Sequence, residues 1–386
     1  MVIVDVVELT QKLIRCPSIT PKDAGCLDLI QTHLETLGFI CHRLPFGGGD
    51  PKATDNLYAR WGTQGKNFCF AGHTDVVPPG DLSHWSVDPF AGVIRNDCVY
   101  GRGAVDMKGA IAAFITAMTE VITHNPPQHS ISLLLTSDEE GPATFGTQKV
   151  IEWLQHKSEH LDACLVGEPT NPHLLGEMIK IGRRGSLNIH LQVQGRAGHV
   201  AYPHFALNPI PPLLDYLGQL TSRPLDQGTD YFDASNLEII SVDVGNPVTN
   251  LIPALATASI NIRFNSLHTG DSLIRFCQER AQSVKQQHSP QLKWIFDFKI
   301  SGESFITNHK PLQDTLVKAV KKITGLTPEL STSGGTSDAR FIKNICPVIE
   351  FGLINAQAHQ VDEHVGVKDL LSLTTIYKEI LNTYFS

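Results

Sequence analysis

The chain has 386 residues, more than one compact domain usually holds, so its length predicts two domains. Hydrophobic residues make up 41% of it and charged residues 18%, which is typical of a globular protein. The formal charge of −8 and the lack of any Lys/Arg run argue against nucleic-acid binding.

The N-terminal segment carries acidic side chains within an apolar run and has no basic stretch, so it predicts neither a signal peptide nor a transmembrane helix. The eight cysteines are scattered and form no Cys-x-x-Cys pair. This pattern favours reduced thiols over a disulfide framework or a zinc ribbon. We therefore expect a cytoplasmic protein that binds no membrane.

The first part of the chain alternates between helices and apolar strands. Helical spacing occurs at residues 3–14, 25–37 and 111–122, and buried strands are predicted at 57–61, 68–71, 131–135 and 163–166. Strands that are apolar on both faces and alternate with helices are typical of a largely parallel α/β sheet.

At about residue 180 the pattern changes to strands in which polar and apolar residues alternate. This alternation indicates a sheet with one solvent-exposed face. Strands are predicted at residues 187–193, 237–244, 258–264 and 294–300, and helices at 211–220 and 273–284. The order β-α-β-β-α-β is that of a ferredoxin-like α+β module.

Beyond residue 301 the first pattern returns, with a helix at 312–323, a buried strand at 348–351 and a helix at 368–384. The sequence thus predicts a discontinuous α/β domain, residues 1–180 and 297–386. The ferredoxin-like module, residues 181–296, is inserted into it.

Residue types that bind metals stand just beyond several of the predicted buried strands. Ligands bind at the carboxyl ends of strands in an open α/β sheet, so these side chains are expected to meet at one edge. A single His or acid there is ordinary, whereas recurrence at several strand ends favours a shared site. The side chains concerned are His73, Asp75, Glu139, Glu140, Glu168 and His359.

His73 and Asp75 point to the same side of an extended chain, so Asp75 can orient the imidazole while His73 presents its other nitrogen to a metal. Asp106 lies among the glycines of residues 101–109, where a carboxylate can be placed tightly. Two imidazoles and several carboxylates suit a pair of divalent ions bridged by one carboxylate, a hydrolytic arrangement. Nitrogen and oxygen ligands favour zinc, with cobalt or manganese as substitutes.

Glu139 and Glu140 cannot both face the metals from a regular strand, because neighbouring side chains point to opposite faces. The turn at residues 141–142 must therefore break the strand. We assign Glu140 as a metal ligand and Glu139 as the general base that moves a proton from the attacking water to the leaving nitrogen. The alternative is that the pair forms a solvated acidic loop. The buried strand before it argues against that alternative.

Four segments carry a family resemblance: His73-Thr-Asp75, residues 101–109, Glu139-Glu-Gly141 and residues 167–170. Together they resemble the M20 metallopeptidase and deacylase family, and the resemblance runs in order over nearly the whole chain. It implies two zinc ions per subunit. It also implies a cis peptide bond after Asp106, a costly feature in a non-proline residue.

The resemblance assigns each ligand to one of the two zinc positions. His73 and Glu168 are implied to hold one ion, Glu140 and His359 the other, and Asp106 to bridge them. Asp75 and Glu139 keep the orienting and general-base roles.

The resemblance further implies that the inserted module mediates a homodimer and closes as a lid. His199, in a Gly-x-x-Gly-His loop, is implied to reach the partner's site and stabilise the oxyanion of the reaction. From its residues alone, that loop indicates only an ordinary surface histidine after a strand with one solvent-exposed face.

Within the family, residues 182–186 and 334–338 favour hydrolysis of N-succinyl-LL-diaminopimelate to succinate and LL-diaminopimelate. This small substrate carries several carboxylates, which guanidinium groups bind bidentately. The implied substrate-binding residues are Lys180, Arg183, Asn250, Arg263 and Thr336.

Two alternatives stay open. One is a related enzyme that acts on N-acetylornithine or a dipeptide. The other is a non-catalytic dimeric binding protein that keeps metal for stability, which would have no use for Glu139 as a base.

Overall fold

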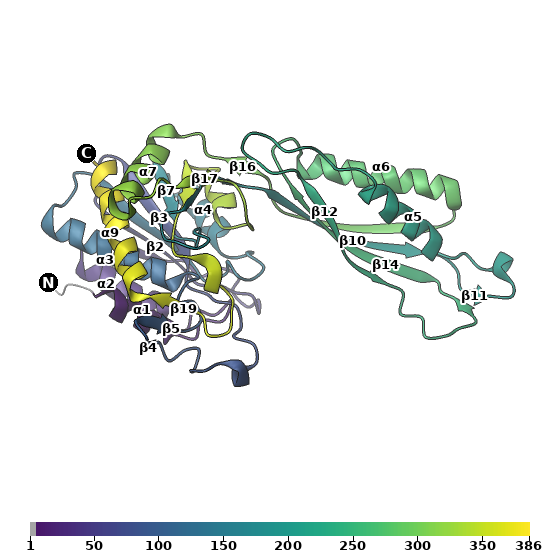
Figure 1. Ribbon diagram of the computed structural model, residues 1–386, viewed down its shortest axis with the longest axis horizontal. Helices are drawn as coiled ribbons and strands as arrows, with labels where there is room; N and C mark the ends of the chain where they lie inside the picture. Colours follow the sequence, from purple (N-terminus) through teal and green to yellow (C-terminus); the bar gives the residue numbers. More distant parts are fainter. Residues whose placement is uncertain (1–4) are drawn as a thin grey trace. The chain divides into compact units, whose positions relative to one another are not determined.

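The computed structural model describes residues 5–386. The first residues of the helix predicted at 3–14, and of the N-terminal apolar run, lie outside this range. The chain divides into two compact units (Figure 1). The first unit comprises Met1–Ile181, Thr307–Ser331 and Ser337–Ser386, and the second comprises Gly182–Ile306 and Thr332–Thr336. The first unit is therefore discontinuous.

The observed limits of the second unit differ from the predicted ones at its C-terminal end. The predicted boundary at residue 296 falls inside strand β15 (Lys293–Gly302), which pairs with β10 (Gly185–Gln194) up to Gly302. A boundary inside a paired strand would break the sheet, so the unit continues to Ile306. Residues 332–336 also belong to the second unit, which the hydrophobic periodicity of the sequence does not predict.

The first unit is built on an eight-stranded sheet with the order β1-β2-β6-β3-β7-β18-β8-β17. Its central strands β6, β3, β7 and β18 run parallel to one another, whereas β1, β2 and β8 make the antiparallel pairings. The strands are β1 (Ile40–Arg43), β2 (Asn56–Trp61), β3 (Asn67–His73), β6 (Ser130–Thr136), β7 (Ala163–Val166), β8 (Met178–Lys180), β17 (Glu329–Ser331) and β18 (Val348–Glu350). The predicted mixed α/β fold with a mostly parallel central sheet is confirmed.

Helices cover both faces of this sheet, since every residue of β3 and β6 is buried. One group, α1, α3, α7 and α9, packs together, and a second group packs on β1, β2 and β6. The first group is α1 (Val6–Ile14), α3 (Lys108–His124), α7 (Lys310–Thr324) and α9 (Val367–Tyr384). The second group is α2 (Cys26–Thr36) and α4 (Thr147–His156), with α8 (Ala339–Ile342) against α4.

The parallel register aligns the carboxyl ends of the central strands. His73 lies beside Thr136, and Ala71 lies beside Val166, which in turn pairs with Glu350. The segments that follow β3, β6, β7 and β18 therefore leave the sheet at one edge. Strand ends thus place the predicted metal-ligand residues near one another.

A small three-stranded sheet lies on the same unit, formed by β4 (Val93–Arg95), β5 (Cys98–Tyr100) and β19 (His364–Gly366). Its β19 pairs with β5, so His364 lies opposite Tyr100. This pairing brings the segment after His359 next to the glycine-rich segment that begins at Gly101.

The second unit has a four-stranded antiparallel sheet with the order β12-β14-β10-β15. Its elements are β10, α5 (Ile210–Thr221), β12 (Asn236–Asp243), β14 (Leu255–Phe264), α6 (Gly270–His288) and β15. Both helices contact the sheet and each other (Figure 1). The predicted ferredoxin-like order of elements is confirmed.

The core of the second unit follows from the alternation along its strands. Leu187, Ile189, Leu191 and Val193 of β10 are buried in this core, and the residues between them are polar. Successive side chains of a strand point to opposite faces. The alternation therefore gives the sheet one apolar face, which α5 and α6 cover.

Short strands complete the second unit. They are β9 (Gly182–Arg183), β11 (Gly198–His199), β13 (Leu251–Ile252) and β16 (Phe305–Ile306). These strands pair as β9 with β16 and β11 with β13. None of the four is predicted from the sequence, because two residues carry no periodicity.

The prediction also omits α4, although its buried Val150, Ile151 and Leu154 have helical spacing. Within residues 5–386, no helix is both long and apolar enough to cross a membrane.

The carboxyl of Asp226, in the second unit, is expected to make the stability of the fold depend on pH. Burial opposes ionisation of its carboxyl, but hydrogen bonds from Ser235, Gly228 and Asn265 outweigh burial and lower its pKa from 3.8 to about 2. A carboxyl whose pKa is lower in the folded state than in the unfolded state stabilises the fold at pH values above its unfolded-state pKa. This stabilisation is lost as the pH falls through the folded-state pKa.

We expect Asp226→Asn to be less stable than the wild type at pH 6 and to lose less further stability between about pH 4 and pH 2. Urea unfolding across this range measures both effects. Asp233→Asn is the matched control, since Asp233 lies on the same segment with an exposed side chain. Parallel pH curves for the wild type and Asp226→Asn would contradict the prediction.

Candidate metal centre

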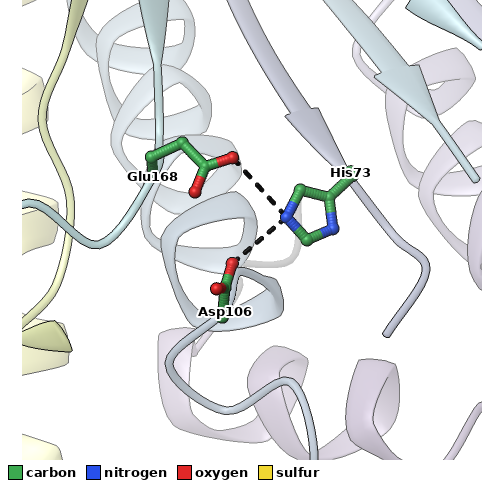
Figure 2. Close-up of side chains that lie close together, drawn as sticks. All are labelled: His73, Asp106 and Glu168. Carbon is green, nitrogen blue, oxygen red and sulfur yellow. Dashed lines mark hydrogen bonds and ion pairs between the residues drawn. The ribbon is translucent and has the colours of Figure 1, made fainter. Parts of the chain in front are cut away.

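His73 ends strand β3 and is almost fully buried, with 1% of its side chain exposed. Its Nδ1 lies 2.9 Å from the main-chain oxygen of Asp75. A carbonyl oxygen only accepts, so Nδ1 carries a proton here, and Nε2 is the nitrogen that faces the site. Nε2 lies 3.1 Å from Asp106 Oδ1 and 3.6 Å from Glu168 Oε1 (Figure 2).

Asp106 lies in the glycine-rich segment before α3, and its two carboxylate oxygens face different histidines. Oδ1 faces His73, and Oδ2 lies 3.4 Å from His359 Nε2. Burial raises the pKa of the Asp106 carboxyl, but hydrogen bonds from His359 and His73 outweigh burial and hold it below the ordinary value. The peptide bond from Asp106 to Met107 is cis, as the family resemblance implies.

The glycines before Asp106 are required by close packing. Gly103 has φ of +85°, and a Cβ there would lie 2.7 Å from Val76 Cγ1. A larger residue is therefore both strained and crowded at this position.

His359 and Glu140 form the other side of the cluster, with His359 Nε2 2.7 Å from Glu140 Oε1. The His359 side chain is about half exposed, at 48%. Hydrogen bonds to Asp106 and Glu140 raise the pKa of the imidazole to about 10. His359 has φ of +62°, an uncommon backbone conformation for a residue other than glycine.

These side chains form two groups of potential metal ligands, in each of which the ligand atoms lie within 4.8 Å of one another. The first is His73, Asp106 and Glu168, and the second is Asp106, Glu140 and His359. Asp106 belongs to both groups. Imidazole nitrogens and carboxylate oxygens in such sets suit zinc, and a shared carboxylate suits two neighbouring ions.

Asp75 contacts both the His73 ring and the loop that carries Glu139 and Glu140. Its main-chain oxygen, not its carboxylate, makes the hydrogen bond to the His73 ring, and the carboxylate lies 3.7 Å from Nδ1. The carboxylate accepts from the main-chain N–H groups of Glu139, at 3.3 Å, and Glu140, at 3.1 Å. Asp75 thus fixes the loop that carries both glutamates.

Glu139 lies beside this cluster, with 12% of its side chain exposed. Burial raises the pKa of its carboxyl to about 8, with His73 opposing the shift and Asp338 adding to it. The Arg340 guanidinium lies 4.0 Å from its Oε1. A buried carboxyl whose pKa is close to neutrality is a candidate general acid or base.

Three residues near the site were not predicted. Asp138 accepts from the N–H groups of Ala143, Thr144 and Phe145, which shapes the loop after β6. Arg340 faces Glu139, and Glu363 lies under the glycine-rich segment. In the sequence all three are ordinary charged residues. The partners of Arg340 and Glu363 are distant in the chain, and those of Asp138 are main-chain N–H groups, which no residue pattern reveals.

The predicted substrate-binding residues fall in both units. Lys180 lies in the first unit on β8, almost fully buried, with Nζ 3.4 Å from Ser331 Oγ. The others lie in the second unit and are Arg183, Asn250, Arg263 and Thr336. Arg183 is buried on β9, and Arg263 is half-buried on β14. Their contacts with a substrate stay predictions.

His199 also lies in the second unit, on β11, with an exposed side chain. Its Nδ1 accepts from the N–H group of Ala201 at 3.0 Å, which leaves Nε2 for another partner. The role of His199 in a partner's site likewise stays a prediction.

Comparison with known proteins identifies the family. Residues 69–383 match the model of peptidase family M20/M25/M40. A succinyl-diaminopimelate desuccinylase from Rhodospirillum centenum is 55% identical over 383 residues, which cover 99% of this chain and 98% of the relative. One from Xanthobacter autotrophicus is 52% identical over 380 residues, covering 98% of this chain and 99% of the relative.

Solved structures share the fold at low sequence identity. An M20 family metallo-carboxypeptidase from Sulfolobus solfataricus has a TM-score of 0.81 at 17% identity and covers 99% of both chains. A dinuclear metal-binding peptidase of the M20 family from Bacillus subtilis has a TM-score of 0.71 at 13% identity, covering 98% of this chain and 97% of that one. The chain belongs to peptidase family M20/M25/M40.

Proposed function

We propose that this protein hydrolyses N-succinyl-LL-2,6-diaminopimelate to succinate and LL-2,6-diaminopimelate. One observation supports the proposal that the protein is a hydrolase. Asp106 belongs to two groups of potential metal ligands, and these groups lie next to the carboxyl of Glu139. The succinyl part is supported by relatives named succinyl-diaminopimelate desuccinylase, 55% and 53% identical to the chain over nearly its full length.

The proposed cofactor is a pair of zinc ions, with cobalt as a substitute. His73, Glu168 and Asp106 would hold one ion, and Glu140, His359 and Asp106 the other. When bound, the ions acidify water and polarise the amide carbonyl.

Glu139 is the proposed general base. Its carboxylate takes a proton from the attacking water and delivers it to the nitrogen as the carbon–nitrogen bond breaks, so the amine leaves neutral. Burial raises the pKa of this carboxyl, which favours its role as both acceptor and donor of the proton. Asp75 holds the main chain of Glu139 in place for both transfers.

The remaining assignments extend the proposal. Lys180, Arg183, Asn250, Arg263 and Thr336 would bind the carboxylates and polar groups of the substrate. In a homodimer, His199 of the partner subunit would stabilise the oxyanion, and the second unit would act as dimerisation domain and lid. All eight cysteines are free, which supports a location in the reducing cytoplasm.

The first test offers the zinc-loaded protein N-succinyl-LL-diaminopimelate and N-acetylornithine separately. We expect turnover of the succinyl compound with a much higher kcat/KM, abolished by a chelator and restored by zinc or cobalt. Release of succinate and of free amine, measured together, checks that the amide bond is cleaved. A preference for the acetyl compound would contradict the substrate assignment while leaving the hydrolytic site intact.

The second test is Glu139→Gln, which keeps the shape of the side chain but removes the proton acceptor. We expect kcat to fall by about 10²–10⁴-fold, with metal content unchanged. Glu152→Gln is the control, because Glu152 is paired with Lys149 on the surface of α4. Wild-type kcat in a metal-loaded Glu139→Gln variant would rule out the role of Glu139.

A further inference from the structure

Glu363 is a fully buried carboxylate that accepts four hydrogen bonds. Its Oε2 accepts from Arg102 Nη1 at 2.7 Å and from the N–H of Gly103 at 3.1 Å. Its Oε1 accepts from the N–H groups of Val105, at 2.9 Å, and Asp106, at 3.2 Å. Four donors converge on one side chain, so the glycine-rich segment is held in place by Glu363.

Arg102 extends this contact to the segment that carries His359. Its Nη1 donates to the main-chain oxygen of Gln360 at 3.1 Å, and its Nη2 to that of His359 at 3.4 Å. The guanidinium also lies over the ring of Trp85, 5.1 Å from its centre, and the side chain is 3% exposed. Arg102 and Glu363 therefore tie the Asp106 segment to the His359 segment.

The two ligand groups differ in how the fold supports them. His73 is the last residue of β3, and Glu168 follows β7 by two residues, so the central sheet holds both. Asp106 and His359 lie on segments outside that sheet. The distance between their side chains depends on contacts between those segments.

We propose that the Arg102–Glu363 pair positions Asp106 and His359 relative to each other, and thereby controls metal affinity at the Glu140–His359 position more than at the His73–Glu168 position. The inference rests on the proposed two-metal function. Arg102 and Glu363 act through Asp106 and His359 and do not bind the metal themselves.

Glu363→Gln is the direct test, because it preserves volume while changing hydrogen bonding. An amide has one acceptor oxygen and one donor nitrogen, so at least two of the four donors lose their acceptor and face another donor. Partners that orient metal ligands typically contribute about 10–100-fold to metal affinity. We expect a loss of that size at one position and little change at the other.

The measurement is a titration of the metal-free protein with Co²⁺, followed by calorimetry and by visible absorption. The wild type is expected to bind two ions per chain, and Glu363→Gln to bind one tightly and one weakly. Glu159→Gln is the matched control: Glu159 also accepts from several groups, Tyr58, Arg60 and Asn67, but near the opposite end of β3. It should keep both affinities. Thermal unfolding of each metal-free variant reports on folding separately.

Arg102→Lys is the second variant, for use alongside Glu363→Gln or if that variant does not fold. A lysine can keep the ion pair with Glu363 but cannot reach both main-chain oxygens, so it should weaken only the Glu140–His359 position. Unchanged affinities at both positions, or equal losses at both, would overturn the inference. A wild type that binds no pair of ions would instead overturn the proposed function.

Discussion

The contact of one carboxylate with two imidazoles is the interaction on which the site depends. Asp106 presents one oxygen to His73 and the other to His359. Each histidine belongs to a different ligand group, so the two groups exist as one centre only while Asp106 stays between them. Gly103 belongs to this requirement, since its φ of +85° is a backbone conformation that glycine adopts without strain in the segment leading to Asp106.

Buried carboxylates shape the loops around this centre. Asp75 accepts from the N–H groups of Glu139 and Glu140, and Asp138 accepts from those of residues 143–145. Glu363 does the same for the segment that ends at Asp106. Loops outside helices and sheets lack regular partners for their N–H groups, and a buried N–H needs one. Charged acceptors also give shorter and stronger hydrogen bonds than neutral ones, so they hold ligand-bearing loops firmly.

The strands of the central sheet position part of the site, and loops outside that sheet position the rest. Parallel strands place His73, Glu168 and the Glu139–Glu140 loop at one edge, which is where such sheets bind ligands. The pairing of β19 with β5 brings the His359 segment beside the glycine-rich segment, and the Arg102–Glu363 pair joins them. A buried ion pair of this kind costs desolvation, which its many hydrogen bonds to the main chain offset.

The sequence by itself determined the α/β sheet, the inserted ferredoxin-like module and the residues at the strand ends. Hydrophobic periodicity and chain order are local properties, so they predict elements and the edge at which His73, Glu168 and Glu140 meet. Only the tertiary structure decided which atoms make each contact. It directs the Asp75 carboxylate to the Glu139 loop, assigns residues 297–306 to the second unit, and pairs Arg102 with Glu363. These contacts join residues far apart in the chain, and no local pattern records them.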